Sequence, residues 1–322
     1  MDGLQLVATG GALPGRMVTN EELSHIVDTS DEWITSRTGI RQRYFCAEGE
    51  STVTLATTAA RQALTRSGLE AKEIGCCICA TVSGDYATPS VACMVQQALG
   101  LPENIPVLDV NAACSGFVYA TAVARGLLAA TEGRFALIIG CEQLSRLTDM
   151  TDRSTCVLFG DGAGAAIFER DAAAPFAVNL GARGDKALLA EGAGAQRSTI
   201  KMEGKPVFRF AVEVLPKCMD ATMAAAGKTL EDVDWVVCHQ ANSRIIDHCV
   251  KKMKAPAEKF YKNMERFGNT SAASIPMALN EMNENGLLLP GQTLLCVGFG
   301  GGLTWGGMLL RVKENLLCNT DC

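Results

Sequence analysis

The sequence predicts a layered α/β sandwich built from two duplicated halves, in which helices cover mainly parallel sheets. Two observations support this fold class. Short apolar runs typical of buried strands, such as residues 74–82 and 135–140, alternate with longer segments of helical periodicity, such as 117–128. The second observation is an internal repeat that extends through the chain. Together they favour one fused unit with separate layers of helices and strands.

The repeated unit joins a helix, a glycine turn, an acidic stretch and an apolar strand. Gly68 in the first copy corresponds to Gly227 in the second, an offset of 227 − 68 = 159 residues. Further segments match at this offset: 59–81 with 219–240, 135–140 with 294–299, and Cys114 with the turn 268–276. The agreement predicts an N-terminal half of residues 1–170 and a C-terminal half of residues 171–322. The alternative is chance recurrence of common α/β patterning.

Composition limits the classes of function. The chain has 322 residues, of which 48% are hydrophobic and 20% charged, so it can bury a large core. Its net charge of −6 argues against nucleic acid as the main partner. The N-terminal apolar run has no basic segment before it and is soon interrupted by Gly10, Gly11 and Pro14. We therefore expect a cytoplasmic protein with no signal peptide and no membrane insertion.

The 14 cysteines do not indicate a disulfide scaffold, because such scaffolds are short secreted chains and this chain is long. Cys76 and Cys79 form a C-x-x-C pattern within an apolar strand, where they would point to opposite faces and could not share a metal ion. Residues 227–229 and 160–164 resemble phosphate-binding motifs, but their glycine spacing is wrong. The sequence therefore predicts neither a metal ion nor a nucleotide cofactor.

Three polar residues fall where α/β proteins place their sites, at the carboxyl ends of strands. Cys114 lies between the strand 105–110 and the helix 117–128, where free amide N–H groups and the helix dipole favour a thiolate. In the second half, His239 ends the strand 233–238 and Asn269 lies in the next strand-to-helix turn. Each alone has an ordinary explanation as a buried cysteine, a core histidine or a turn asparagine. Their combination predicts one catalytic site.

The motifs around these residues resemble β-ketoacyl-acyl carrier protein synthase III, a thiolase-fold condensing enzyme of type II fatty-acid synthesis. The matching segments span nearly the whole chain: DTSDEWI at 28–34, RTGI at 37–40, AACSGF at 112–117, TDR at 151–153, FGDGAGA at 159–165, HQANSRII at 239–246, GNTSAAS at 268–274 and FGGGLTWG at 299–306. The resemblance implies a thiolase-like α-β-α-β-α sandwich.

The resemblance also implies a decarboxylative Claisen condensation. Cys114 would attack the thioester of an acyl-CoA, and the N–H groups of Cys114 and Gly301 would hold the oxyanion. Malonyl-acyl carrier protein would then lose CO₂, and His239 and Asn269 would donate hydrogen bonds to the enolate oxygen. Phe299 would help to keep water out of the site. The CoA thioester and phosphopantetheine are substrates in this scheme, so it needs no cofactor.

The family's CoA site maps onto five residues of this chain. Trp33 and Arg153 resemble the pair that stacks on adenine, and Arg37 would meet a phosphate group. Thr29 and Asn242 would hydrogen-bond the nucleotide or the pantetheine arm.

A basic patch would dock the acidic acyl carrier protein, and it would comprise Arg209, Arg244, Lys251, Lys252 and Lys254. The alternative for these charges is an ordinary solvated helix face.

The chain departs from the family pattern at Thr88, where familiar members often carry an aromatic residue that gates the acyl pocket of the dimer partner. The preferred primer therefore stays open, whereas a homodimer is expected from the family's interface around this position. The segment 184–198 also differs from the corresponding segment of better-known family members.

One other possible function is a related acyltransferase or secondary-metabolite condensing enzyme of the same fold. Another is a non-catalytic subunit of a condensing complex, against which the presence of Cys114, His239 and Asn269 argues.

Overall fold

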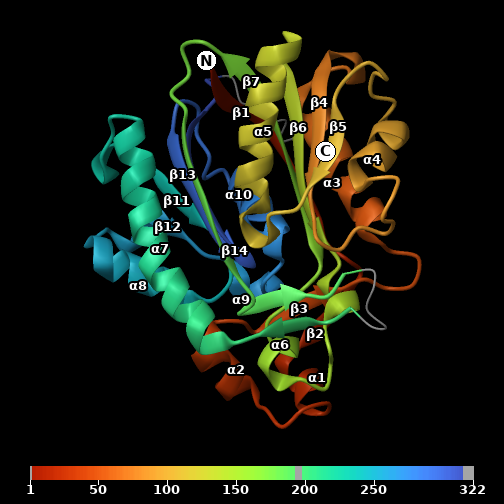
Figure 1. The fold of residues 1–322 in the computed structure, drawn as a ribbon, viewed down its shortest axis with the longest axis vertical. Helices are drawn as coiled ribbons and strands as arrows, with labels where there is room; N and C mark the ends of the chain where they lie inside the picture. Colours follow the sequence, from red (N-terminus) through yellow and green to blue (C-terminus); the bar gives the residue numbers. More distant parts are fainter. Residues whose placement is uncertain (1, 193–197, 315–322) are drawn as a thin grey trace.

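The computed structural model describes residues 2–192 and 198–314 (Figure 1). The elements of the first half are β1 (Gly3–Ala12), β2 (Arg16–Thr19), α1 (Asn20–Ser24), α2 (Asp31–Thr38), β3 (Gln42–Phe45), α3 (Thr52–Ser67), β4 (Ile74–Ala80), α4 (Val91–Leu99), β5 (Val107–Val110), α5 (Gly116–Thr131), β6 (Phe135–Glu142), α6 (Arg153–Cys156) and β7 (Gly162–Asp171). Those of the second half are β8 (Ala177–Asp185), β9 (Leu188–Ala190), β10 (Ile200–Met202), α7 (Gly204–Ala225), β11 (Trp235–Cys238), α8 (Ser243–Met253), β12 (Phe260–Tyr261), α9 (Met264–Phe267), α10 (Ser274–Glu284), β13 (Thr293–Gly300) and β14 (Gly302–Val312).

The order of the strands repeats between the halves. The first half has the order β1-β7-β6-β4-β5, and the second has β8-β14-β13-β11-β12, so each strand corresponds to the one numbered seven higher. A short parallel pairing between β1 and β14 joins the two sets, with Gln5 opposite Arg311. The repeated order confirms the duplicated α/β architecture. The boundary between residues 170 and 171, which falls at the end of β7, stays a prediction.

The sheet is mixed, which corrects the expectation of mainly parallel sheets. β5, β4 and β6 run parallel to one another, whereas β7 runs antiparallel to both β6 and β1. A parallel return requires a long crossover, usually a helix. The segment between β6 and β7 carries only the four-residue helix α6 and a short 3₁₀ turn, and β13 and β14 are joined directly at Gly301.

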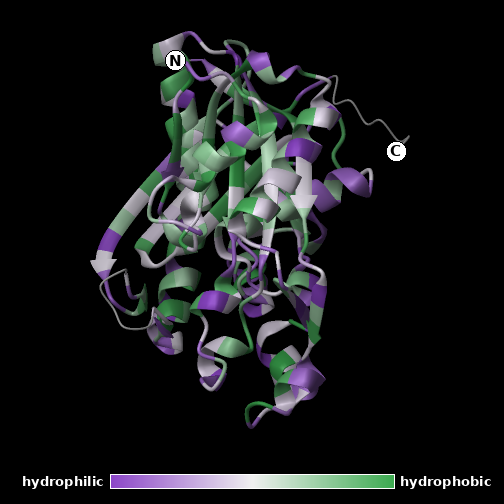
Figure 2. Cartoon of the chain, turned by 90° about the vertical axis from the view of Figure 1, so that its right-hand side faces the viewer, coloured by the Kyte–Doolittle hydropathy of each residue, from purple (hydrophilic) through white to green (hydrophobic). Residues whose placement is uncertain are grey.

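Alternating side chains divide the core into layers. On β4, Cys76 packs with α5 and α10 in a central cluster, whereas Cys79 packs with α3 and α4 in an outer cluster. On β13, Leu294 faces the central cluster and Leu295 faces α7 and α8. The layers are thus helix, strand, helix, strand, helix, and apolar residues concentrate along the strands (Figure 2). Cys76 and Cys79 do point to opposite faces, as predicted.

The central helix α5 is the most apolar long helix of the structure. The segment Ala113–Thr131 is long and apolar enough by length and composition to cross a membrane, but half of it is buried inside the protein. It packs against β4 and β6, and it contributes Phe117 and Leu128 to the central cluster. Core helices commonly combine this length and composition with burial on more than one side.

Candidate active site

The predicted nucleophile lies where a 3₁₀ turn meets the sheet of the other half. Cys114 belongs to the turn Ala113–Ser115, which leads directly into α5. The turn packs so closely on β13 that a Cβ atom at Gly300 would lie 2.5 Å from the Cys114 amide nitrogen. Glycine is therefore required at this point of the strand. The Ser115 hydroxyl ties the turn to β14 through a 2.8 Å hydrogen bond to Thr304 Oγ1.

The duplicated turn in the second half is built in the same way. It comprises Ser271–Ala273 and leads into α10. Ser271 has a φ of 50°, and Ala113 in the first turn has a φ of 46°. A Cβ atom at Gly140 of β6 would lie 2.2 Å from the Ala272 carbonyl oxygen. Gly140 thus allows the second turn to approach β6 in the way that Gly300 allows the first turn to approach β13. Each half therefore supplies a turn that rests on a strand of the opposite half, and the two turns contact each other.

Burial, rather than the helix dipole, dominates the acidity of Cys114. The side chain is buried, and this raises the pKa of the thiol to about 12, although a hydrogen bond from Ser271 lowers it. The negative charge of Glu142 raises the pKa further. The expectation of a resting thiolate is therefore wrong, because burial removes the solvent that would stabilise a charged sulfur and the start of the helix does not offset this loss. The resting group is a thiol.

His239 is buried and held by one partner. Its Nδ1 lies 2.7 Å from Ser274 Oγ, the first residue of α10, which leaves Nε2 for other contacts. Burial lowers the pKa of the imidazole to about 3, so His239 is neutral at pH 7. Phe299 packs edge-on to the imidazole, with ring centres 5.5 Å apart. A neutral imidazole in this setting is suited to donate a hydrogen bond.

Asn269 is oriented by its own turn. Its Oδ1 accepts a 2.9 Å hydrogen bond from the Ser271 amide, and its backbone forms a parallel bridge with Phe159. Because Oδ1 is engaged, the Nδ2 amide group is the part of the side chain that can donate into the neighbouring cavity. The contacts of Ser271 and Ser274 were not predicted from the sequence, although both residues lie within the family motif at 268–274.

Two cavities meet at Cys114. The first has a volume of about 150 Å³ and is lined by Cys114, His239, Asn269 and Phe299. The structure therefore brings together the three residues that the sequence predicted to form one site. The second cavity has a volume of about 410 Å³ and is lined by Cys114, Ser271, Gly301 and Gly302, with apolar walls from Val82, Leu144, Phe159, Leu188 and Ile200. The predicted segment 184–198 borders this cavity, and its residues 193–197 lie outside the described part of the chain.

Glu142 is the buried carboxyl group closest to this chemistry, and the sequence analysis did not identify it. It ends β6 and is fully buried. Burial raises the pKa of its carboxyl group to about 7, against hydrogen bonds that lower it. The available signal was its position at the carboxyl end of a buried strand, the same signal that identified His239.

The proposed CoA-binding residues lie on α2 and α6 and just before α2 and α8. The Arg153 guanidinium lies 4.9 Å from the centre of the Trp33 ring, so the structure brings this pair together across 120 positions of sequence. Arg153 also donates a 2.8 Å hydrogen bond to the Asp28 carbonyl. Arg37 lies in the last turn of α2, and its carbonyl accepts a 3.0 Å hydrogen bond from Asn242 Nδ2.

Asn242 and Thr29 have structural positions that limit their contacts. Asn242 caps α8 by accepting a 2.9 Å hydrogen bond from the Arg244 amide, while it also lines the smaller cavity at Cys114. The Thr29 hydroxyl is covered and has no hydrogen-bond partner among the described residues. A ligand would reach the hydroxyl of Thr29 only after its side chain rotates.

The proposed docking residues lie in two groups. The Arg244 guanidinium lies 5.5 Å from the centre of the Phe208 ring, and Phe208 lines the smaller cavity at Cys114. Arg209 follows Phe208 on α7, and its side chain is exposed. Arg244 therefore lies beside the smaller cavity, whereas Arg209 lines a separate groove with Arg183 and Glu213.

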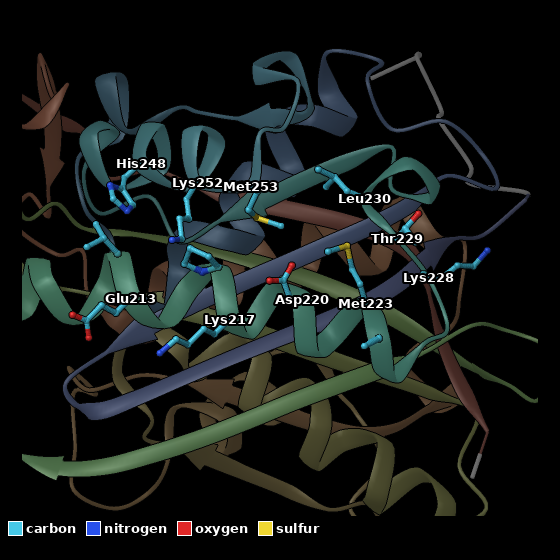
Figure 3. A pocket seen from close by; sticks show the side chains of 13 residues that line it. Glu213, Lys217, Asp220, Met223, Lys228, Thr229, Leu230, His248, Lys252 and Met253 are labelled. Carbon is cyan, nitrogen blue, oxygen red and sulfur yellow. The ribbon is translucent and has the colours of Figure 1, made fainter.

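The second group lies at the far end of α8. Lys251 and Lys252 occupy its last turn, and Lys254 is its C-terminal cap. Lys252 lines a separate groove of about 750 Å³ between α7 and α8, in which it faces Lys217 and Asp220 (Figure 3). This groove contains none of the three predicted catalytic residues.

Thr88 lies in the exposed loop between β4 and α4 and lines neither cavity at Cys114 of its own chain. The gate role that the sequence predicted for Thr88 acts on a partner subunit, so it stays a prediction.

Comparison with known proteins identifies the family. Two models match, 3-oxoacyl-[acyl-carrier-protein] synthase III over residues 108–184 and its C-terminal part over residues 223–312. A β-ketoacyl-[acyl-carrier-protein] synthase III from Rhizorhabdus wittichii is 44% identical over 314 residues, which cover 95% of this chain and 98% of the relative. The chain belongs to the 3-oxoacyl-[acyl-carrier-protein] synthase III family. It is therefore an acyl-transferring condensing enzyme, as its motifs predicted.

Solved structures of the synthase III family share the fold. The 3-oxoacyl-[acyl-carrier-protein] synthase III of Aquifex aeolicus superposes with a TM-score of 0.91 at 41% identity, covering 96% of this chain and all (100%) of that one. The priming β-ketosynthase of the R1128 polyketide pathway superposes with a TM-score of 0.89 at 32% identity, covering 97% of each chain. The likeness confirms the thiolase-like sandwich that the sequence predicted.

Proposed function

We propose that this synthase III condenses an acyl-CoA primer with malonyl-acyl carrier protein to give a 3-oxoacyl-acyl carrier protein, the first condensation of fatty-acid synthesis. The observation that carries the proposal is the meeting of two largely apolar cavities at Cys114, one of which also holds His239 and Asn269. A nucleophile shared by two cavities suits a thioester whose acyl chain and pantetheine arm must lie on opposite sides of the reacting carbonyl.

The first half-reaction transfers the acyl group to Cys114. The sulfur attacks the thioester carbonyl, and the amide N–H groups of Cys114 and Gly301 hold the oxyanion of the tetrahedral intermediate. Both residues line the larger cavity, whose walls suit an acetyl group or a similar short or branched acyl chain. Collapse of the intermediate releases CoA and leaves the acyl group on sulfur.

The second half-reaction generates the carbon nucleophile. Malonyl-acyl carrier protein loses CO₂, and the enolate oxygen accepts hydrogen bonds from His239 Nε2 and Asn269 Nδ2. Neutral His239 is suited to this donor role because its Nδ1 is engaged by Ser274. Phe299 makes the surroundings apolar and disfavours the charged carboxylate. The enolate carbon then attacks the acyl-Cys114 carbonyl.

Substrate binding follows from the groups at the mouth of the site. We assign Trp33 and Arg153 to the adenine ring, and Arg37, Thr29 and Asn242 to the phosphates and the pantetheine arm. The flat ring and flat cation of the first pair suit a nucleobase face. CoA and phosphopantetheine act as substrates here, and the scheme uses no metal ion or other cofactor.

Carrier-protein docking is assigned first to Arg244, because it contacts Phe208 of the active-site cavity, and then to Arg209, the residue after Phe208 on α7. Lys251, Lys252 and Lys254 would extend the basic surface along α8. Opposite charge on an acidic carrier protein would speed encounter and orient its arm.

A cytoplasmic homodimer completes the proposal. Strand β5 lies at the edge of the sheet, and all four of its residues are only half-buried, which suits pairing with a second copy. In such a dimer Thr88 would reach the partner's acyl cavity.

The second candidate is a condensing enzyme of secondary metabolism, favoured by the replacement of the usual aromatic gate with Thr88. A condensation assay with malonyl-acyl carrier protein and a panel of acyl-CoA primers tests both. Turnover of short primers supports the fatty-acid role. Turnover confined to unusual primers supports the alternative, and absence of condensation with every primer contradicts both.

A further inference from the structure

Glu142 has an unusual hydrogen-bond environment for a fully buried carboxyl group. Its Oε2 accepts three hydrogen bonds, from Ser83 Oγ at 2.6 Å, the Val82 amide at 3.1 Å and Thr81 Oγ1 at 3.3 Å. Its Oε1 is buried and has no partner that meets hydrogen-bond geometry among the described residues. A buried oxygen that accepts no hydrogen bond lowers the stability of the fold, so a functional role of this carboxyl group is expected.

Ser271 connects this carboxyl group to the nucleophile. Its turn packs against both the Cys114 turn and β6, the strand that ends at Glu142. Hydrogen bonding by the Ser271 side chain lowers the pKa of both the Cys114 thiol and the Glu142 carboxyl group. Ser271 also lines the larger cavity together with Cys114. Its backbone is fixed, because its amide donates to Asn269 Oδ1 at 2.9 Å. The three side chains therefore form a path of two steps from sulfur to carboxylate.

We propose that Glu142, acting through the Ser271 hydroxyl, accepts the proton that Cys114 loses when it attacks the acyl-CoA. The inference rests on the proposed function. As the sulfur bonds to the thioester carbonyl carbon, the thiol proton passes to Ser271 Oγ and the Ser271 proton passes to Glu142 Oε1. When the tetrahedral intermediate collapses, the bond between the carbonyl carbon and the CoA sulfur breaks. The proton then returns from Glu142 through Ser271 to the departing CoA sulfur, so protons and electrons balance.

The alternative base, His239, is poorly suited to this step. Its imidazole is a weak base because burial lowers its pKa to about 3, and its Nδ1 is occupied by Ser274. Glu142 is a stronger base, since burial raises its pKa to about 7. The thiol pKa of about 12 is higher still, so the proton must leave as the carbon–sulfur bond forms rather than beforehand.

The groups that face Glu142 leave its titration simple. Besides Cys114, they are the thiols of Cys79 on β4 and Cys141 on β6, and burial raises the pKa of both far above 7. All three thiols are neutral at pH 7. Acylation should therefore accelerate as the pH rises through about 7, because Glu142 must be ionised to accept the proton.

The test is the single-turnover rate of Cys114 acylation by acetyl-CoA, followed by mass spectrometry between pH 5.5 and 8.5. Glu142→Gln and Ser271→Ala should each slow acylation about 100-fold, the lower end for a proton-transfer group, and should lose the inflection near pH 7. Glu142→Asp should recover part of the rate. Decarboxylation of malonyl-acyl carrier protein should change less than threefold in all variants.

Two controls separate this role from a structural one. Glu169 is another buried carboxyl group; it lies on β7, away from the cavities, and forms ion pairs with Arg134 and Lys313. Glu169→Gln removes its charge and should leave acylation unchanged. If Glu142→Gln does not fold, Ser271→Ala decides the question, since alanine already adopts a similar positive φ at Ala113.

The opposite electrostatic effect makes the outcome decisive. The charge of Glu142 raises the pKa of Cys114, so removing it should favour the thiolate if Glu142 acts only as a neighbouring charge. Faster acylation and faster iodoacetamide alkylation in Glu142→Gln would therefore overturn the proposal. Equal loss of acylation and decarboxylation would also overturn it. Failure of the wild-type protein to become acylated would instead refute the proposed function.

Discussion

Ser274 Oγ lies 2.7 Å from His239 Nδ1, and this contact orients the imidazole so that Nε2 is the nitrogen left for the cavity. The Gln240 amide donates to the same hydroxyl oxygen at 3.4 Å, so the Ser274 hydroxyl is assigned as the donor to Nδ1. The remaining imidazole proton is then on Nε2, where it can be donated to an enolate oxygen. Helix α10 thus positions His239 through its first residue.

Replacing Ser274 with alanine should remove the hydrogen bond that keeps the imidazole proton of His239 on Nε2. We expect Ser274→Ala to slow malonyl decarboxylation about tenfold, the effect of losing one ordinary hydrogen bond, and to leave acylation of Cys114 within about twofold. Stopped-flow release of CO₂ and mass spectrometry of the acyl-enzyme measure the two steps. Ser67→Ala, a buried serine on α3, is the matched control. Equal slowing of both steps in Ser274→Ala would contradict a role through His239.

His239 and Asn269 should act on the same half-reaction. His239→Ala and Asn269→Ala should each reduce decarboxylation at least about 100-fold, as loss of an oxyanion donor does, while acylation persists. Because burial lowers the pKa of His239 to about 3, decarboxylation should show no inflection from this group between pH 5 and 8. If both variants lost acylation as fully as decarboxylation, His239 would have to activate the thiol instead.

Much of this site could be predicted from the sequence because it depends on position. His239 and Asn269 follow the parallel neighbours β11 and β12, whose carboxyl ends lie at one edge. Cys114 follows β5 of the other half, and its turn joins them by packing on β13. The acidity of Cys114 could not be predicted, because it depends on how fully the other half covers the turn. Glu142 was hidden for a similar reason. It ends an apolar strand, and only the packing of the two turns brings Ser271 within reach of both groups.

The buried carboxyl of Glu142 should make stability depend on pH. Its folded pKa of about 7 lies above the ordinary value of 4.5, so the folded state holds a proton that the unfolded state loses between these values. Stability from this group is full below about pH 4.5 and falls as the pH rises to 7, by roughly 3 kcal/mol at most. Urea unfolding at pH 5 and pH 8 measures this change.

Glu142→Gln provides the comparison, because it cannot ionise. Relative to the wild-type protein, it should gain stability between pH 5 and pH 8. A difference in unfolding free energy that is the same at both pH values would show that Glu142 is not titrating in this range.

The basic residues near the mouth should affect only the carrier-protein step. Arg244→Glu should raise the apparent KM for malonyl-acyl carrier protein about tenfold and weaken its salt dependence, while acylation by acyl-CoA changes little. Lys72→Glu makes the same change of charge at an exposed position of the first half and should have no effect. Unchanged carrier-protein kinetics in Arg244→Glu would place docking on another face.

The central claim is that Cys114 carries the acyl group, and peptide mapping after incubation with acetyl-CoA or another short acyl-CoA tests it most directly. The two cavities that meet at this residue predict one acyl group per chain, on the peptide that contains Cys114, and no acylation of Cys114→Ala. An acyl group on Cys93 or Cys156 instead, or acylation that persists in Cys114→Ala, would contradict the account.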